Sequence, residues 1–337
     1  MSSVLVTGGS GFVGRSLVPM LAKNGYSVRT TCRDLVSLSG EWRKSDINWV
    51  EFNLENKHED YSALMKDIDI VIHVAGQAHI TRKDEQTLKS FRKVNVDGTR
   101  KLATEANAAG VKQFIFISTI KVFGERSVLT ANGNVHRFTE NDIPEPVGLY
   151  AMSKFEAEQA IQDICNKNNQ MQYLILRPPL IYGPHVKANF LRLINLVSKG
   201  IPLPFASIDN KRSLLYVDNL NQVILAALAR PEAIRNNTYV VSDVDVSLPQ
   251  LIREISGHFD KKTKLFSLPV PLLHLAGYLT GRKLLIDRLV ESLLVDSTKI
   301  TQELGWIPEV NFEDGIRNTI EWYKKQQQQP ENIIRKL

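Results

Sequence analysis

Short apolar runs alternate with longer stretches of helical spacing through the first half of this 337-residue chain. The helical stretches are amphipathic, whereas the short runs are rich in β-branched residues. Strands that alternate with helices predict an α/β fold whose parallel sheet is doubly wound, with helices on both faces. The strands are expected at residues 3–7, 26–32, 48–53, 69–75, 111–119 and 171–177, and the helices at 12–24, 60–66, 86–109 and 149–168.

The second half of the chain mixes short helices with proline-rich turns and predicts a smaller C-terminal α/β lobe that binds substrate. Asn219 to Ala229 and Thr238 to Val241 are expected to return to the first lobe as a helix and a strand. Leu268 to Leu279 is interrupted by prolines and predicts a buried or interfacial helix. The expected division is a first domain at 1–177 with a returning segment at about 213–242, a substrate lobe at 178–212 and 243–330, and a tail at 331–337.

Three glycines fall in the turn between the first strand and the first helix. Gly8 allows the tight bend, Gly11 lets the backbone approach a pyrophosphate, and Gly14 allows the helix to pack closely on the strand. The first turn of a helix offers free N–H groups to phosphate. This spacing at the start of a strand–helix unit predicts a dinucleotide site of the Rossmann type.

The end of the second strand favours a phosphorylated dinucleotide. An acidic residue there binds the ribose 2′-hydroxyl, and an arginine accommodates a 2′-phosphate. This chain has Cys32 at the position where the acid is expected, and Arg33 follows it. We therefore expect NADP(H) in preference to NAD(H). Asp34 lies two positions late and could still reach a ribose, so both cofactors stay open.

Tyr150 and Lys154 are the candidate acid–base pair. They lie four residues apart in a stretch of strong helix formers, and therefore on one face of a helix. A nearby ammonium favours the phenolate, so the pKa of Tyr150 is expected to move from about 10 toward neutrality. Such a phenol exchanges protons with an oxygen on a carbon that gains or loses hydride.

Composition excludes several other classes of protein. The net charge is +6, but the basic residues are scattered among acidic ones, and no nucleic-acid motif is found. There is no run of 18 apolar residues, and the first strand starts at residue 3, which leaves no room for a signal peptide. Cys32 and Cys165 show no disulfide or metal spacing. We expect a cytoplasmic protein with no metal, no membrane span and no nucleic-acid partner.

Several further segments resemble the extended short-chain dehydrogenase/reductase family, and within it the nucleotide-sugar epimerase/dehydratase/reductase group. The likeness covers nearly the whole chain. The segments are His73-Val-Ala-Gly76, Asn95-Val-Asp-Gly-Thr-Arg-Lys-Leu102, Ile117-Ser-Thr-Ile-Lys-Val-Phe-Gly124 and Arg177-Pro-Pro-Leu-Ile-Tyr-Gly-Pro184.

The resemblance implies roles at the cofactor and the reacting carbon. Thr119, with Ser118 beside it, is expected to hold the substrate oxygen, and Lys154 also to bind the nicotinamide ribose. Asn95 is either structural or close to the cofactor. The remaining cofactor residues implied are Gly8, Ser10, Gly11, Phe12, Val13, Gly14, Arg33, Asn53, Leu54, Val74, Ala75, Gly76, Tyr150 and Pro178.

The resemblance also implies a UDP-sugar site. Arg212 is expected to pair with the diphosphate, because a guanidinium fork matches phosphate oxygens. Arg288 is the candidate for a second phosphate arginine, with Arg282 as its competitor. Asn189 and Phe190 are expected near the diphosphate or the base, and Pro204 near the uracil.

Three reactions share this machinery. Dehydratases of the group need an added acid and base, and here Ile120 and Lys121 replace them. The sequence most resembles bacterial 4-keto reductases that make UDP-N-acetyl-quinovosamine-type sugars for O-antigen or capsule. We therefore expect an NAD(P)H-dependent reductase of a UDP-4-keto-6-deoxy-N-acetylhexosamine. The alternative is a UDP-sugar 4-epimerase with tightly bound NAD.

Two rival classes are less favoured. A dinucleotide sensor that kept only the fold would usually lose Tyr150 or Lys154, and both are present. A reductase of small apolar ketones would not need the segment that begins at Arg212. The family suggests a homodimer formed through the helices at 86–109 and 149–168.

Overall fold

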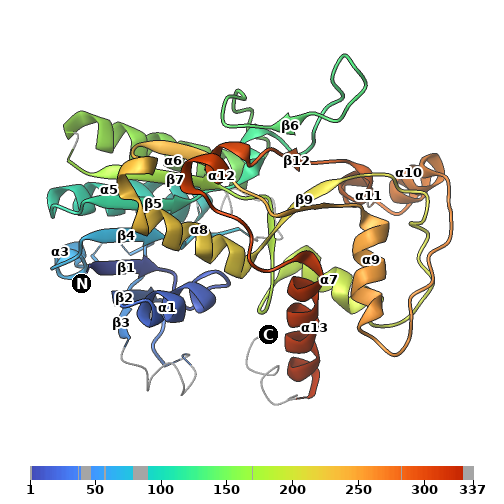
Figure 1. Cartoon of the computed structure of the whole chain (residues 1–337), viewed down its shortest axis with the longest axis horizontal. Coiled ribbons are helices and arrows are strands. Elements are labelled where there is room, and N and C mark those ends of the chain that lie inside the picture. The colour runs from blue at the N-terminus through green and yellow to red at the C-terminus, as the bar shows by residue number, and fades with distance from the viewer. Residues whose placement is uncertain are drawn as a thin grey trace.

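The computed structural model describes residues 2–36, 38, 47–56, 58–78, 90–168, 170–281 and 283–328. A seven-stranded parallel sheet forms the larger part of the molecule (Figure 1). Its strand order is β10-β7-β5-β4-β1-β2-β3. The strands are β1 (Ser3–Thr7), β2 (Ser27–Cys32), β3 (Asn48–Glu51), β4 (Ile70–His73), β5 (Gln113–Ile117), β7 (Gln172–Arg177) and β10 (Asn237–Val240).

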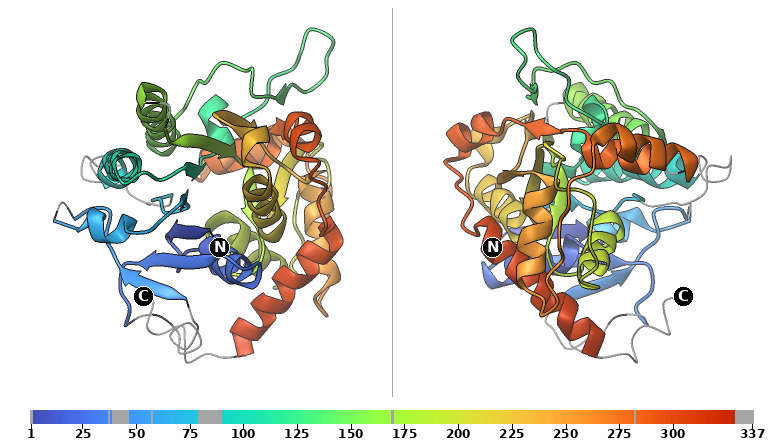
Figure 2. Two further views of the ribbon diagram at one scale, coloured as in Figure 1. Left: turned by 60° about the vertical axis from the view of Figure 1, so that its left-hand side comes forward. Right: turned by 90° about the vertical axis from the view of Figure 1, so that its right-hand side faces the viewer.

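Helices cover both faces of this sheet, as Figures 1 and 2 show. Alternate side chains of each strand point to opposite faces, so Val4 and Val6 pack on one side and Leu5 on the other. The first face carries α1 (Gly14–Lys23), α8 (Val217–Ala229) and α12 (Thr298–Leu304). The second carries α3 (Tyr61–Met65), α5 (Thr99–Ala108) and α6 (Leu149–Asn168). The predicted doubly wound, Rossmann-type sheet is confirmed.

The helix expected at 86–109 has a different form over the part that the structure describes. A π-helix, η1 (Arg92–Gly98), precedes α5. A π-helical turn is wider than an α-helical turn, and such turns occur often at functional sites. This one carries Asn95, which is buried.

The second lobe packs around a core of its own, at the right of Figure 1. Its small sheet has the order β11-β9-β8, and short 3-10 helices lie outside it. The apolar stretch at Leu268 to Leu279 contains the expected helix, α10, but only Leu273 and Gly277 of that helix are buried. The elements of the second lobe are β8 (Leu180–Tyr182), β9 (Arg212–Tyr216), β11 (Val244–Val246), α7 (Ala188–Val197), α9 (Leu248–Gly257), α10 (Val270–Leu279), α11 (Lys283–Val290) and α13 (Phe312–Gln328). The 3-10 helices η2 (Ile120–Phe123) and η3 (Pro231–Ile234) pack on the larger lobe instead.

The returning segment expected at 213–242 is shared between the two sheets. Helix α8 and strand β10 join the large sheet, whereas β9 pairs with β8 and β11 in the small one. The domain division therefore remains a proposal, and its tail at 331–337 lies outside the described residues. No helix in the described part of the chain is both long and apolar enough to cross a bilayer.

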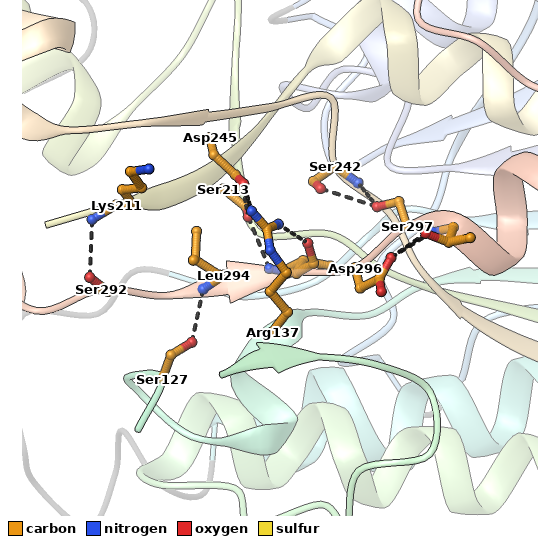
Figure 3. A network of polar contacts seen from close by, with 12 residues as sticks. Ser127, Arg137, Lys211, Ser213, Ser242, Asp245, Ser292, Leu294, Asp296 and Ser297 are labelled. Carbon is orange, nitrogen blue, oxygen red and sulfur yellow. Dashed lines mark hydrogen bonds and ion pairs between the residues drawn. The ribbon is translucent and has the colours of Figure 1, made fainter. Parts of the chain in front are cut away.

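A polar seam joins the segment after η2 to the second lobe (Figure 3). Strand β6 (Arg137–Phe138) pairs with β12 (Leu294–Val295), and a bridge links Arg212 to Leu293. The Ser127 hydroxyl accepts from the Leu294 N–H at 2.9 Å, and Arg137 pairs with Asp245 at 2.5 Å. The seam therefore fixes the two ends of this segment, at Ser127 and at Arg137, against the lobe that carries Arg212.

A buried ion pair ties α6 to β7. Glu158 is 1% exposed and Arg177 6% exposed. Their contacts are bidentate, with Arg177 Nε 3.1 Å from Glu158 Oε1 and Nη2 2.6 Å from Oε2. The Arg177 guanidinium also lies over the Phe123 ring, 4.8 Å from its centroid. A paired geometry of this kind offsets much of the cost of burying two charges.

Glu158→Gln should destabilise the protein by about 3–5 kcal/mol, because it leaves a guanidinium buried without its counter-charge. Urea unfolding measures the loss. The double variant Glu158→Leu/Arg177→Met should recover most of it, since neither charge then needs a partner. Glu156→Gln is the matched control, because Glu156 pairs with an Arg92 side chain that is 54% exposed. If Glu158→Gln and Glu156→Gln lowered the free energy of unfolding equally, burial of the ion pair would not be the cause.

Candidate active site

The backbone of the glycine turn between β1 and α1 is packed too closely to leave room for side chains at Gly8 and Gly14. A Cβ on Gly14 would lie 2.4 Å from the Gly8 carbonyl oxygen, so the start of α1 is pressed against the turn. Gly8 has a φ of +77°, in the left-handed region that favours glycine. Its N–H donates to the Thr31 hydroxyl at 3.1 Å. Val13, the N-cap of α1, has no side chain able to cap the helix. These features fit a dinucleotide phosphate bound by backbone N–H groups.

The other residues predicted to bind the cofactor follow neighbouring strands of the sheet. Arg33 and Asp34 are exposed just after β2. Asn53, two residues after β3, lines a pocket together with Glu55, Asn56, His58 and Lys93. The carboxyl edge of a parallel sheet is where such folds bind ligands. Ser10, Phe12, Leu54, Val74, Ala75 and Pro178 also lie in the segments that follow strands along this edge.

Ser118 and Thr119 follow β5 directly. Thr119 caps η2, and its hydroxyl accepts from the Lys121 N–H at 3.3 Å. The backbone of the segment is held to β7, since the Ser118 N–H donates to the Leu176 carbonyl at 2.7 Å. The buried Ser118 hydroxyl has no hydrogen-bond partner among the described residues.

Tyr150 lies near Thr119, and Lys154 follows one turn further along α6. The Tyr150 hydroxyl lies close enough to the Thr119 side chain for that hydroxyl to lower the pKa of Tyr150. Lys154 is 4% exposed, and its ammonium lies 3.9 Å from the centroid of the Phe116 ring. A Cβ built on Gly76 would lie 3.7 Å from Lys154 Nζ, which places the lysine against the loop after β4.

The expected acidification of Tyr150 by Lys154 is wrong for this structure. Burial raises the pKa of Tyr150 to about 12, and the nearby Thr119 hydroxyl lowers it only in part. Burial also lowers the pKa of Lys154 to about 7, against the nearby charge of Glu158. Desolvation disfavours the charged form of both groups and is the largest cause of each shift. The spacing of the two residues indicates a charge partner but not how deeply the pair is buried.

The Asn95 side chain links two segments of the site. Its amide oxygen accepts from the Gln77 N–H at 2.8 Å, and its amide nitrogen donates to the Ser153 hydroxyl at 2.9 Å. The Ser153 hydroxyl donates in turn to the Tyr150 carbonyl at 2.8 Å. Asn95 therefore clamps the loop after β4 to the first turn of α6. The role of Ser153 was not visible in the sequence, although it lies between Tyr150 and Lys154.

His73 is a second group that sequence reasoning missed. It is fully buried and bridges Thr7 and Thr99, with ring nitrogen to hydroxyl distances of 2.6 and 2.8 Å. Burial and the nearby Lys154 lower the pKa of His73 to about 3, so the ring is neutral at physiological pH. Its ring stacks on Phe116, the same ring that lies beneath Lys154. His73 thus supports the floor of the site.

The two arginines predicted to bind phosphate meet at the seam. Arg212 Nη1 donates to the carbonyl oxygens of Arg288 and Glu291 at 3.0 and 3.2 Å. The Arg288 side chain is 49% exposed and pairs with Glu125. Burial lowers the pKa of Arg212, and Glu125 and Glu291 oppose that shift. Arg282, the competing candidate, lies outside the described residues.

The remaining substrate candidates lie on or near α7. Asn189 is exposed in its first turn, and Pro204 lies in the connection between α7 and β9. Phe190 is 2% exposed, and its ring stacks on Tyr182 with centroids 5.5 Å apart. That ring belongs to the core of the second lobe, so only the Phe190 backbone is left for the predicted substrate contact.

Residues 4–242 match the model of the NAD dependent epimerase/dehydratase family. The chain is 39% identical over 321 residues to a UDP-glucose 4-epimerase of Vibrio cholerae, with 94% of each chain covered. It is 26% identical to an N-acetyl-alpha-D-glucosaminyl-diphospho-ditrans,octacis-undecaprenol 4-epimerase of Escherichia coli O157:H7, with 95% of each chain covered. The crystal structure of a Bacillus cereus UDP-glucuronic acid 4-epimerase is similar in fold, with a TM-score of 0.78 at 22% identity over 96% of this chain and 99% of that one.

The fold and the Tyr150–Lys154 site define an extended short-chain dehydrogenase/reductase. This chain belongs to the NAD dependent epimerase/dehydratase family, as the resemblance implied. The expected nicotinamide dinucleotide is confirmed for the family, whereas the choice between NADPH and NADH stays a prediction.

Lys154→Met should stabilise the cofactor-free protein. Burying the Lys154 ammonium costs desolvation free energy in the folded state, and the unfolded chain does not have this cost. The lysine has a pKa of about 7 when folded and 10.5 as a free group. Below pH 7 the substitution should raise the free energy of unfolding by its full amount, about 3–5 kcal/mol. This gain should shrink as the pH rises from 7, because the folded lysine then loses its proton before the unfolded one.

Urea unfolding across this range of pH measures the effect. Lys112→Met is the control, because Lys112 is 77% exposed and pairs with Asp69 at the surface. A gain that did not change with pH would show that the cost of the lysine is not electrostatic.

Proposed function

We propose that this protein is a nucleotide-sugar 4-epimerase that uses NAD and acts on a UDP-sugar. The observation that carries the proposal is the contact of Tyr150 with Thr119 beside a buried Lys154, in a chain 39% identical to a UDP-glucose 4-epimerase. Arg212 and Arg288 support a diphosphate in the substrate, because guanidinium groups suit phosphate oxygens. The comparisons favour the epimerase over the reductase that the sequence suggested first.

The side chains present suit proton exchange at C4 of a sugar. The turn that holds Gly8, Gly11 and Gly14 would bind the phosphates of a nicotinamide dinucleotide, and that cofactor would supply reversible hydride transfer at C4. Tyr150 would take the proton of the 4-hydroxyl as the carbonyl forms, and would give it back when the hydroxyl is remade. Thr119 would hold the same oxygen. The Thr119 hydroxyl lowers the pKa of Tyr150, which is the direction that a base needs.

The second candidate is the 4-keto reductase, and one observation favours it. A pKa of about 12 keeps the Tyr150 hydroxyl protonated at neutral pH. That is the form a reductase needs, because its tyrosine gives a proton to the developing alkoxide. Dehydration is less favoured than either reaction, since Ile120 carries no titratable group and Lys121 carries a cation.

The test uses purified protein and two assays. Interconversion of UDP-glucose and UDP-galactose, or of their N-acetyl forms, without added reductant would support the epimerase. Loss of NAD(P)H absorbance that depends on a UDP-4-keto sugar, with no interconversion, would support the reductase. If the protein shows neither of these activities, both candidate functions are overturned.

Tyr150→Phe is the variant that tests the mechanism. It should lower turnover by about two orders of magnitude or more, because it removes the group that exchanges the proton. Dinucleotide binding, followed by fluorescence titration, should change little. Unchanged turnover would remove Tyr150 from the reaction.

Arg33→Ala tests the choice of cofactor. Arg33 is exposed after β2, where an arginine accommodates a 2′-phosphate. The variant should bind NADPH roughly tenfold more weakly and bind NADH almost as before. Lys23→Ala, which removes an exposed cation at the end of α1, is the control. Equal losses for the two dinucleotides would argue against contact with the phosphate.

A further inference from the structure

Lys121 belongs to a cluster of cations that surrounds one carboxylate. Its ammonium lies 3.0 Å from Glu125 Oε1. Arg288 contacts the same carboxylate, with Nη2 3.5 Å from Oε1 and Nε 3.2 Å from Oε2. Arg212 is held beside Arg288 through the Arg288 carbonyl. Lys121 and Arg288 therefore share one carboxylate oxygen, although they lie on different lobes.

The backbone of Lys121 belongs to the reacting end of the site. Its N–H donates to Thr119 Oγ1, and the Thr119 side chain lies near the Tyr150 hydroxyl. Its side chain extends one turn along η2 toward Arg288. Lys121 thus spans the distance between the group that would hold the sugar oxygen and the arginines that would hold the diphosphate.

The charges of the cluster do not balance. Among the described residues, four cations lie around two carboxylates, Glu125 and Glu291; the cations are Lys121, Arg126, Arg212 and Arg288. Arg126 and Glu291 pair with each other at 2.9 Å and add no net charge. Two positive charges therefore remain, and the diphosphate of a nucleotide sugar carries one negative charge on each phosphate. A phosphate is also a stronger ligand for such donors than a single shared carboxylate.

We propose that Lys121 is a third cation for the diphosphate, and that it binds the phosphate nearer the sugar. The inference rests on the proposed nucleotide-sugar substrate. Lys121 contacts that phosphate from the side of Thr119, and Arg212 and Arg288 contact the diphosphate from the second lobe. Glu125 holds the Lys121 and Arg288 side chains beside each other and competes with the phosphate for the same N–H donors.

The test is the binding of UDP and UMP to Lys121→Gln, measured by isothermal titration calorimetry. The variant should bind UDP about tenfold more weakly, because it loses one charge-assisted contact. UMP, which lacks the second phosphate, should bind as it does to the unchanged protein. Lys121→Arg keeps the cation and should keep most of the UDP affinity. Lys112→Gln removes a surface cation that pairs with Asp69, and should have no effect.

Glu125→Gln separates substrate binding from a merely structural role. It keeps the hydrogen-bonding shape of the side chain but removes the competing charge, so UDP should bind as tightly as before or a few times more tightly. Weaker UDP binding, to the same degree as in Lys121→Gln, would show that Lys121 acts only through Glu125. A loss confined to UDP-sugars, with UDP unchanged, would place Lys121 on the sugar. Either result would overturn the proposal.

The outcome also distinguishes this proposal from the proposed function. If the unchanged protein does not bind UDP, both fail. If it binds UDP and interconverts UDP-sugars while Lys121→Gln binds UDP normally, only the assignment of Lys121 fails. Thermal unfolding of each variant shows that the comparison is made on folded protein.

Discussion

The row of Tyr150, Lys154 and Glu158 along α6 is the constraint on which the site depends. The three groups follow at intervals of four residues, so they share one face of the helix; Lys154 and Glu158 are buried there, and Tyr150 is half-buried. Glu158 is held by Arg177 of β7, and the ammonium of Lys154 lies on Phe116 of β5. The helix can therefore neither rotate nor slide without exposing a buried ion pair.

That burial also sets the chemistry of the pair. Desolvation moves the pKa values of Tyr150 and Lys154 in opposite directions, away from charge in both cases. The result is a protonated phenol beside an amine that titrates near neutrality. A ligand that brings charge to the site can shift this balance in either direction, whereas an exposed pair would hardly respond.

The spacing of apolar residues predicts the large sheet and α6 well, because that spacing reflects which face of each strand or helix is buried. The glycine spacing likewise follows from the steric demands at Gly8 and Gly14. Other features depend on contacts between distant segments. Glu125 and Arg288 are 163 residues apart, and no local pattern joins them. The pKa of Tyr150 was predicted with the wrong sign because spacing identifies the neighbouring charge but not the depth of burial.

Contacts between distant segments also fix the position of Thr119 relative to Arg288. The segment after Thr119 contributes Lys121 and Glu125, and then runs into the seam with β12. An anchored segment holds Thr119 at a fixed distance from Arg288, because Glu125 bonds to the arginine and η2 is capped by the threonine. Under the proposed function, a substrate that spans this distance would place its reactive carbon at Thr119 when its diphosphate meets Arg288. The enzyme would then select substrates by the distance between these two groups, apart from any contact with the sugar itself.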